Sequence, residues 1–325
     1  MVNIKQIAQQ AGVSVSTVSR VLNNHPYVRA DKRERVQQVI EQNSYTPNSQ
    51  AINLIRGKTK TVGLILPFSH HPYYHAIIAG VMEEAYQYGY HVLLCQTSYN
   101  PDQEREYLHM LSTRQVDGII ACSRVLPWAE LQSYSDSGPI VVCEYTEESN
   151  LSAVYTDHYG AFCSGIQYLL DHGYTRIGYC IGRKTSASSQ ERFRAYQNTL
   201  HAAGLEVYQE WIFPDCIHMS DGEQIAKRIA TMESPPSALI VTGDEAAAGV
   251  MLGARQYGLR IPEQLAIIGY DNQPISAGLQ LTTIDQNLQE IGRQAFSLFY
   301  ERSLDATIMP VKRQIPYTLI ERHSV

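Results

Sequence analysis

The sequence predicts a small all-α helix-turn-helix head joined to a larger α/β body of two lobes with parallel sheets. Three observations predict this fold class. The first 23 residues read as two short helices with a tight turn between them, and the region beyond residue 60 alternates apolar runs with helical segments. Positive charge is concentrated near the N-terminus of a chain whose net charge is −6. A length of 325 residues is enough for about two or three separate cores.

The first helix of the head is predicted from apolar residues that share one helical stripe. These residues are Ile4, Ile7, Ala8 and Ala11. Gly12 follows them, and a glycine permits the positive φ that a tight turn requires. The first helix is therefore expected to end at this turn.

The second helix is expected to begin after Ser14, a residue type that caps helix N-termini, and to bury Val18 and Val21. The residues predicted to face outward are Val15, Ser16, Thr17 and Arg20. Methyl and hydroxyl groups followed by an arginine suit a helix end in the major groove of DNA, where thymine methyls and guanine acceptors are exposed. A surface helical hairpin without a DNA partner is the alternative.

The charge distribution favours the DNA interpretation. Residues 1–60 carry nine Lys and Arg and three acidic residues, whereas the rest of the chain carries 17 basic and 29 acidic residues. The net charge of the first part is therefore +6 and that of the second part is −12. Attraction to phosphates is confined to the head by this asymmetry.

A third helix is expected over residues 31–43, where apolar residues recur at helical spacing. Pro47 ends this pattern, because the residue before a proline is pushed out of the α region. Residues 49–56 can form about two further helical turns, too few to be stable alone in water. Residues 57–60 follow as a basic linker.

The body is predicted from short apolar runs that alternate with helical segments. Continuous apolar runs suit strands that are buried on both faces of a parallel sheet. The predicted strands lie at residues 62–66, 92–95, 118–121 and 140–143 in a first group, and at 176–179, 238–241 and 265–269 in a second. Two such sheets imply two similarly built lobes, with a ligand-binding cleft at the carboxyl ends of the strands.

The chain has no apolar run long enough to span a membrane and no secretion signal at its N-terminus. Its six cysteines are widely spaced and include no Cys-x-x-Cys pair. We interpret them as reduced residues that pack in the core. These features predict a cytoplasmic protein with no membrane partner.

Residues 8–14 read Ala-x-x-Ala-Gly-Val-Ser, and residues 17–23 read Thr-Val-Ser-Arg-Val-Leu-Asn. This pattern resembles the start of the lactose/galactose repressor (LacI/GalR) family. Five later motifs fall in the family's order: Tyr45-x-Pro47-Asn48, Thr242-Gly243-Asp244, Gly258-Leu259-x-Ile261-Pro262-Glu263, Gly269-Tyr270-Asp271-Asn272 and Leu281-Thr282-Thr283-Ile284. The resemblance covers the whole chain and implies a body like that of the periplasmic binding proteins.

The resemblance also implies a division of the chain. Residues 1–46 would form the helix-turn-helix DNA-binding domain, residues 47–60 the hinge helix and linker, and residues 61–325 the effector-binding and dimerisation domain. Within the last part, lobe one would take residues 61–157 plus 287–313. Lobe two would take residues 158–286 plus 314–325.

In this family, two residues after the capping serine and a later arginine set operator preference, which implies that Val15, Ser16 and Arg20 read bases. The residues expected to contact phosphates are Asn3, Ser14, Thr17, Ser19 and Asn23. Arg29 stands where the family commonly has a capping serine, so we expect Asp31 to compensate at the start of the third helix.

The segment after Pro47 resembles the family's hinge helix, which binds the minor groove. The motif positions there are Asn48, Ala51 and Leu54, and the leucine wedges between bases. Ile52 departs from the pattern, because many members have an arginine at this position. A linker leucine packed on the body is the alternative for Leu54.

Six residues are expected, by motif position, to contact a ligand in the cleft: Tyr73, Tyr74, Glu144, Arg192, Asp244 and Asp271. Sugars and sugar phosphates are recognised by planar hydrogen-bonding groups and aromatic faces, which these residue types supply. The structural alternatives are a turn cap for Asp271, helix-start packing for the two tyrosines and an ion pair for Arg192. Gly243 stands where the family usually has asparagine, which removes one ligand contact.

Catalysis is not expected from this sequence. No glycine-rich dinucleotide turn follows the first strand, residues 57–59 lack the upstream glycine of a P-loop, and Gly-x-Ser-x-Gly is absent. His70, His71 and His75 are joined by no cysteine or acid, and Pro72 is expected to interrupt the helix there. We therefore expect neither a metal nor a cofactor.

The combined prediction is a sequence-specific regulator of transcription that binds double-stranded operator DNA. It is expected to repress carbohydrate-utilisation genes and to change its operator affinity when a small sugar or sugar phosphate binds. A homodimer on a two-fold symmetric operator is expected, because so small a head binds weakly alone. A nucleobase, another metabolite or a protein corepressor is the alternative effector. The competing classes are an α/β enzyme and a stand-alone sugar-binding protein, which would lack the basic head.

Overall fold

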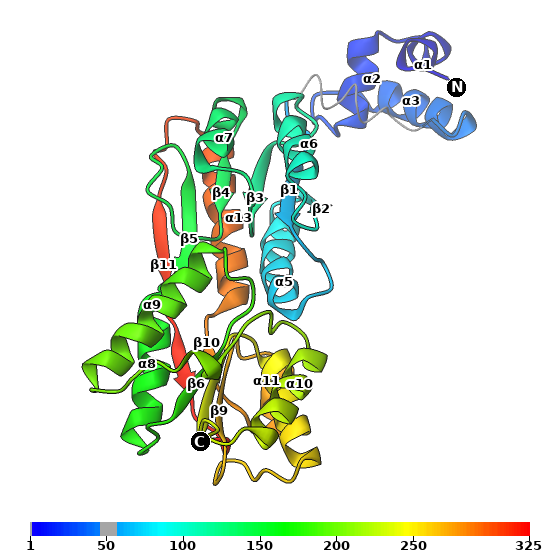
Figure 1. The fold of residues 1–325 in the computed structure, drawn as a ribbon. Helices are drawn as coiled ribbons and strands as arrows, with labels where there is room; N and C mark the ends of the chain where they lie inside the picture. The colour runs from blue at the N-terminus through cyan, green and yellow to red at the C-terminus, as the bar shows by residue number, and fades with distance from the viewer. Residues whose placement is uncertain (1, 46–56) are drawn as a thin grey trace. The chain divides into compact units, whose positions relative to one another are not determined.

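The computed structural model describes residues 2–45 and 57–325 of the chain (Figure 1). The chain forms two compact units, Met1–Thr59 and Lys60–Val325, which we call the head and the body. Within the described residues, no helix combines the length and the apolar composition that crossing a bilayer requires.

The described part of the head is a bundle of three helices. α1 spans Ile4–Ala11, α2 spans Val15–Leu22 and α3 spans Ala30–Gln42. Gly12 ends α1 in the left-handed region with a φ of 63°, a conformation that glycine adopts without strain. The helices share a small apolar core of Ile7, Ala8, Ala11, Val18, Val21 and Val36. The predicted helix-turn-helix is confirmed.

Lobe one of the body is a parallel sheet with the strand order β11-β5-β4-β3-β1-β2. Its strands are β1 (Thr61–Leu66), β2 (His91–Gln96), β3 (Gly118–Ala121), β4 (Ile140–Val142), β5 (Ser152–Thr156) and β11 (Lys312–Ile315). Its helices are α5 (Pro72–Gln87), α6 (Pro101–Ser112), α7 (Trp128–Ser133) and α13 (Leu288–Leu304). β11 and α13 come from near the end of the chain, which returns to this lobe after forming most of lobe two.

Lobe two has a second sheet with the order β12-β10-β9-β8-β6-β7, in which only β12 runs antiparallel to its neighbour. Its strands are β6 (Ile177–Cys180), β7 (Ile212–Phe213), β8 (Ala238–Val241), β9 (Ala266–Tyr270), β10 (Thr282–Asp285) and β12 (Thr318–Ile320). Its helices are α8 (His158–Asp171), α9 (Ala187–Ala202), α10 (Met219–Thr231), α11 (Asp244–Gln256) and α12 (Pro274–Leu279). The predicted two-lobed α/β body with mostly parallel sheets is confirmed.

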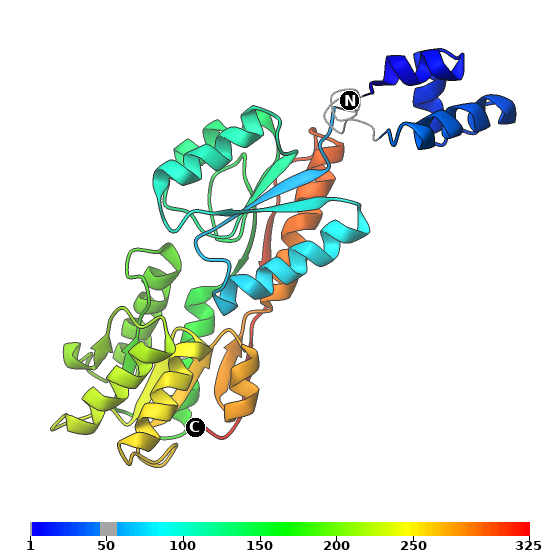
Figure 2. The same cartoon turned by 90° about the vertical axis from the view of Figure 1, so that its right-hand side faces the viewer.

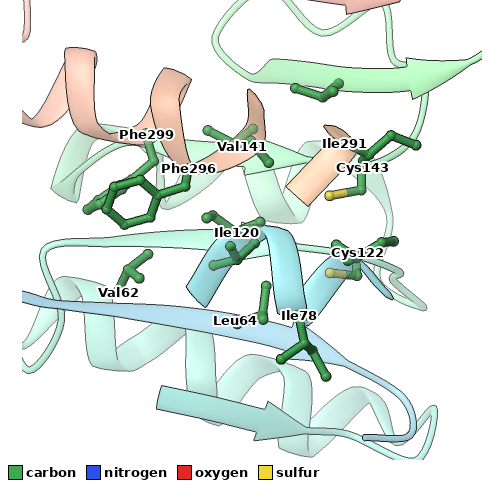
Figure 3. Packing of buried hydrophobic residues seen from close by; sticks show 14 of the residues in the cluster. Val62, Leu64, Ile78, Ile120, Cys122, Val141, Cys143, Ile291, Phe296 and Phe299 are labelled. Atoms are coloured by element: carbon green, nitrogen blue, oxygen red, sulfur yellow. The ribbon is translucent and has the colours of Figure 1, made fainter. Parts of the chain in front are cut away.

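The core of lobe one lies between its sheet and two covering helices. Figure 3 shows Phe296 and Phe299 of α13 close to Ile120 and Val141 of the sheet, and all four side chains are buried. Burial on this face explains why the strands are apolar without alternation, since helices also cover the opposite face. The core thus holds the sheet of lobe one in place, and the loops at the carboxyl ends of its strands extend from one edge of that sheet.

α5 and α13 lie side by side in lobe one (Figure 2) and approach closely at two glycines. A Cβ atom on Gly80 would lie 1.9 Å from the carbonyl oxygen of Gln289, and one on Gly292 would lie 2.2 Å from that of Ile77. Any larger side chain would force the helices apart. Close contact between these two helices therefore requires glycine at both positions.

The chain crosses between the lobes three times: from β5 to α8, from β10 to α13 and from β11 to β12. Thr156 Oγ1 donates a hydrogen bond to the carbonyl oxygen of Gln286 at 3.5 Å. Asn287 Nδ2 donates one to the carbonyl oxygen of Pro316 at 3.0 Å. These bonds connect all three crossings into one junction, so a change in the angle between the lobes must pass through it.

Several details differ from what the sequence led us to expect. Pro72 does not interrupt α5 but opens it, because the first helical position leaves its N–H unbonded and therefore accepts proline. β11 belongs to lobe one through Ile315, two residues beyond the boundary expected at 313. The remaining unexpected strands are β5, β7, β10 and β12. β7 has only two residues, and the other three are short and mix polar with apolar residues. Such strands carry little periodic signal of their own.

Candidate functional site

The N-terminus of α2 carries a cluster of hydroxyl groups. Ser14 caps the helix, because its Oγ accepts the backbone N–H of Thr17 at 3.3 Å. The same Oγ lies 2.8 Å from Ser16 Oγ and 2.9 Å from Thr17 Oγ1. Hydroxyl donors at the positive end of a helix suit an anionic phosphate.

The residues expected to read bases share one exposed face of α2. Val15 is 41% exposed, although it is apolar, and Ser16 and Arg20 are exposed as well. Val18 and Val21 lie on the opposite face, in the core of the head. An exposed valine methyl pair beside a hydroxyl and a guanidinium offers groups that match base edges in the major groove.

Two helix starts in the head depend on specific side chains. Asn3 caps α1, since its Oδ1 accepts the backbone N–H groups of Lys5 and Gln6 at 3.0 and 3.1 Å. Arg29 provides no side-chain cap for α3, and its Nε instead bonds Asp31 Oδ1 at 3.1 Å. An acidic residue in the first turn favours the positive helix end, which agrees with the compensation expected of Asp31.

The remaining head residues named from the sequence differ in their surroundings. Thr17 and Ser19 are half-buried, and Asn23 is exposed and donates from Nδ2 to the carbonyl oxygen of Ser19 at 2.8 Å. Arg33 of α3 donates to Asn24 Oδ1 at 2.9 Å and so holds the loop that follows α2. The sequence did not indicate this bracing role. The three hinge positions lie outside the described residues: Asn48, Ala51 and Leu54.

In the body, polar and aromatic residues gather where the parallel strands end. The loops after β1, β2, β3, β4, β6 and β9 supply most of them, as the topology of parallel sheets predicts. We define the inter-lobe cluster as Tyr73, Tyr99, Arg124 and Glu144 of lobe one together with Arg183, Arg192 and Asp271 of lobe two. Sequence motifs named four of these residues and missed Tyr99, Arg124 and Arg183. Each of the three follows a strand of a parallel sheet, and this position could have marked them as candidates.

Arg192 of α9 is the central cation of the cluster. Its Nη2 donates to Ser189 Oγ at 3.1 Å, and its Cζ lies 5.5 Å from the ring centroid of Tyr270. Its Nε is buried and has no hydrogen-bond partner among the described residues. A buried donor without a partner is costly, so this guanidinium is suited to bind a ligand hydroxyl or anion.

The hydroxyl of Tyr73 in lobe one interacts electrostatically with Asp271 and Arg192 of lobe two. Burial raises the pKa of Tyr73 well above its ordinary value, Asp271 raises it further and Arg192 opposes the shift. All three groups are therefore close enough to interact across the lobe boundary. Tyr74 is 8% exposed, and its hydroxyl lies 3.3 Å from that of Tyr99, which favours the packing role for this tyrosine.

Asp271 is held by two side-chain amides. Gln286 Nε2 donates to Oδ1 at 2.6 Å, and Gln273 Nε2 donates to Oδ2 at 3.1 Å. Its backbone adopts a φ of 101°, an uncommon value for a residue other than glycine. Burial, followed by the nearby Asp244, raises the pKa of Asp271 well above its ordinary value. Strain and burial at one residue are typical of a functional position.

Asp244 lies behind the cluster rather than in it. Its side chain is fully buried, and its two oxygens accept hydrogen bonds from Thr283 Oγ1 and from the backbone N–H of Gln273, each at 2.6 Å. Burial raises the pKa of Asp244 to about 7, although these hydrogen bonds act to lower it. The residue expected to touch a ligand is thus placed where it positions the loop that carries Asp271.

Glu144 is paired within lobe one. Its Oε1 lies 3.1 Å from Arg124 Nε, and the Arg124 guanidinium stacks on Trp128 with 3.5 Å between Cζ and the ring centroid. Burial raises the pKa of Glu144, while Arg124 and Arg183 act to lower it. Because Arg124 neutralises it, Glu144 is less available to a ligand than the sequence led us to expect.

His158, at the start of α8, is a further buried group that the sequence did not indicate. Its Nδ1 lies 3.2 Å from the hydroxyl of Tyr270. Burial, together with the positive charge of Arg192, lowers the pKa of His158 to about 3. The imidazole is therefore neutral at physiological pH and adds no charge beside Arg192. Among the described residues, no group of three His, Cys, Asp or Glu side chains is arranged to hold a metal.

A helix-turn-helix with an exposed reading face, combined with a two-lobed body that gathers polar groups at its lobe boundary, defines a ligand-responsive DNA-binding regulator. Residues 3–48 match the family described as bacterial regulatory proteins, lacI family. Residues 59–322 match periplasmic binding proteins and sugar binding domain of LacI family. The chain belongs to the LacI family of bacterial transcriptional regulators.

Similar proteins span nearly the whole chain. The uncharacterized HTH-type transcriptional regulator YkvZ of Bacillus subtilis is 38% identical over 100% of both chains. Catabolite control protein B of the same organism is 39% identical over 93% of this chain and 95% of its own. Among solved structures, the transcriptional regulator CelR–cellobiose complex has a TM-score of 0.73 and 24% identity over 100% of both chains. A LacI family regulator from Lactobacillus casei with bound sucrose has a TM-score of 0.75 and 23% identity over 82% of this chain and 99% of its own.

The raised pKa of Asp244 predicts a stability change with pH. In the unfolded chain this carboxyl ionises near 3.8, whereas in the folded chain it ionises near 7. Between these values only the unfolded state releases its proton, so the free energy of unfolding contributed by Asp244 falls as pH rises. The fall is on the order of a few kcal/mol, at about 1.4 kcal/mol per pKa unit. In urea unfolding at pH 5 to 8, wild type should therefore lose stability relative to Asp244→Asn.

The control for this prediction is Asp136→Asn, which removes a carboxyl from an exposed position in lobe one. This variant should follow the wild-type profile at every pH. Parallel profiles for wild type and Asp244→Asn would contradict the raised pKa.

Proposed function

We propose that the protein is a repressor whose affinity for its operator is set by a carbohydrate effector bound at the inter-lobe cluster. The observation that carries this proposal is Arg192, a buried guanidinium with an unused Nε donor, next to Tyr270 and electrostatically coupled to Tyr73 of the other lobe. Guanidinium groups and aromatic faces are the groups that sugars bind. The sugars named for two structural neighbours, cellobiose and sucrose, support this class of ligand.

The proposed DNA contacts follow from the exposed face of α2. Val15, Ser16 and Arg20 would read base edges in the major groove, while Asn3 and the hydroxyl cluster around Ser14 would hold phosphates. The same phosphate-holding role is proposed for Thr17, Ser19 and Asn23. By family resemblance, Asn48, Ala51 and Leu54 would contact the minor groove. A repressor of this kind acts on the chromosome, which places it in the cytoplasm.

A homodimer is part of the proposal, and exposed apolar residues on lobe one support it. β2 is the edge strand of its sheet, and Leu93 and Leu94 on it are 38% and 44% exposed. On α5, Met82 and Tyr86 are 54% and 87% exposed and lie one helical turn apart. Exposed edge strands and apolar surface of this extent are typical of subunit interfaces.

Replacing Arg20 tests the proposed reading of bases. On a duplex enriched for binding from a random pool, Arg20→Ala should lose about 1–3 kcal/mol of binding free energy and tolerate a change at one base position. Arg29→Ala is the matched control, because it removes the same charge from an exposed residue of the head that bonds Asp31. Fluorescence anisotropy on the enriched and on random duplexes measures both effects. Equal losses by Arg20→Ala on the two duplexes would exclude base reading.

Replacing Arg192 tests the proposed effector site. The full chain is screened by thermal shift against sugars, sugar phosphates and nucleobases, and binding of each hit is measured by calorimetry. Arg192→Gln should weaken the hit by about tenfold or more, because charge-assisted hydrogen bonds are lost. Arg194→Gln, whose arginine is exposed and paired with Glu191, should bind as wild type does. Undiminished binding by Arg192→Gln rejects the site, and a nucleobase as the sole hit rejects the carbohydrate class.

Replacing Tyr86 tests the proposed homodimer. Tyr86→Glu should place a charge on the α5 surface and convert the dimer to monomer at micromolar concentration, as measured by sedimentation velocity. Tyr208→Glu changes a tyrosine of lobe two that is 44% exposed and should leave the dimer intact. A wild-type chain that sediments as a monomer would contradict the proposed assembly.

A further inference from the structure

Arg183 differs from the other two arginines of the inter-lobe cluster in how its donors are used. Arg124 bonds Glu144 and donates to the carbonyl oxygen of Leu126 at 2.7 Å. Arg192 donates to Ser189. Within residues 57–325 of the structure, the Arg183 guanidinium forms neither a hydrogen bond nor an ion pair. Its N–H groups are therefore available to a ligand.

An aromatic ring from the opposite lobe holds this guanidinium in place. Arg183 Cζ lies 4.1 Å from the ring centroid of Tyr99. Stacking occupies one face of the planar group and leaves the N–H donors at its edge free. Tyr99 is fixed in turn by the hydroxyl of Tyr74 at 3.3 Å and by the ring of Phe68, whose centroid is 5.5 Å away. The arginine is thus held without using the donors that would bind an anion.

Among the described residues, Arg183 has no ion-pair partner of its own, although it attracts the Glu144 carboxylate at longer range. Glu144 is the acidic member of this edge of the cluster, and its ion pair with Arg124 at 3.1 Å neutralises both groups. Asp271, the other acidic member, accepts two hydrogen bonds from the amides of Gln273 and Gln286. An additional anion beside Arg183 would therefore gain attraction without displacing an existing pair.

The segment that carries Arg183 provides further donors. It joins β6 to α9, a helix of 16 residues whose N-cap is Ser186. Ser186 Oγ lies 3.3 Å from Ser188 Oγ, and Arg192 projects from the same end of the helix to Ser189. A turn from a parallel strand into a helix, with hydroxyls and arginines near the helix start, suits the oxygens of a phosphate group.

We propose that the effector is a phosphorylated carbohydrate and that Arg183, backed by Tyr99, binds its phosphate at the turn between β6 and α9. This inference rests on the proposed effector site and decides between the neutral and the phosphorylated ligand. Arg183 comes from lobe two and Tyr99 from lobe one, so the bound phosphate would lie at the lobe boundary. Arg183 is then the residue that selects phosphorylated over neutral sugars.

Inorganic phosphate is the probe that tests this assignment on the full chain. Thermal unfolding of the body is followed against phosphate concentration, with sodium chloride at equal ionic strength as the reference. Wild type should be stabilised by phosphate, Arg183→Gln should need about tenfold more phosphate for the same shift, and Arg183→Lys should fall between them. Arg194→Gln is the matched control and should respond as wild type does. Phosphate bound by the basic head is common to all four proteins and does not contribute to their differences.

A second measurement compares glucose with glucose 6-phosphate under the same conditions. Stabilisation by the phosphorylated sugar at lower concentration than by glucose, lost in Arg183→Gln, supports the assignment. Equal phosphate responses in wild type and Arg183→Gln, or no wild-type response beyond that to chloride, would overturn it. A neutral sugar that alters operator affinity while phosphate does not stabilise the body would also overturn it, yet would leave the proposed function standing. Operator affinity that responds to no metabolite would remove the proposed function, whereas phosphate binding through Arg183 would still be measurable.

Discussion

The bond between Gln286 and Asp271 links the two features on which the body depends, the inter-lobe cluster and the junction between the lobes. The side chain of Gln286 donates to Asp271 at 2.6 Å, and its backbone carbonyl accepts from Thr156 at 3.5 Å. Thr156 and Gln286 belong to two of the three crossings between the lobes. A ligand that competes for the Asp271 carboxylate therefore acts directly on a residue of the junction. This is a contiguous physical route by which occupancy of the site can bias the arrangement of the lobes.

Burial makes the polar groups around this bond mutually dependent. Asp244 fixes the backbone of Gln273, Gln273 and Gln286 fix Asp271, and His158 stays neutral beside Arg192. An unsatisfied polar group in such surroundings costs about 1–3 kcal/mol, so each donor restricts its acceptor to one arrangement. Arg192 Nε is an exception, since it is buried without a partner among the described residues. The hydroxyl of Tyr179 and the Oε1 atoms of Gln273 and Gln286 are likewise buried without a partner among the described residues. A rigid surround with open polar atoms is how a protein prepares a site for a ligand.

The head differs from the body in that its functional groups are exposed rather than buried. Its stability comes from a small apolar core. Six apolar side chains form that core, while side-chain caps from Asn3 and Ser14 satisfy the starts of α1 and α2. Each such cap contributes about 1 kcal/mol, a large share of what so small a core can supply. The basic residues that attract DNA add nothing to the core. Their field extends about 10 Å at moderate salt, so it acts on phosphates that come close to the head.

Local patterns in the sequence were sufficient to predict the helices of the head and the central strands of the body. The turn at Gly12, the cap at Ser14 and the strands β1, β3 and β8 depend on neighbouring residues and on burial, which periodicity reports directly. Motif resemblance also pointed to Arg192 and Asp271, which the structure brings close to each other. It also named Asp244 and Glu144, but a motif position does not reveal that Thr283 bonds the first carboxylate and Arg124 the second.

The sequence by itself determined the fold class, the segregation of charge and the family, since these depend on composition and on spacing along the chain. Only the tertiary structure decided which side chains meet at the lobe boundary. The stacking of Arg183 on Tyr99 and the bond from Gln286 to Asp271 join residues of separate loops, each of which follows a different strand. Whether a buried polar group keeps an unused donor, as Arg192 does, depends on all the elements packed around it. It therefore cannot be predicted from any single segment of the chain.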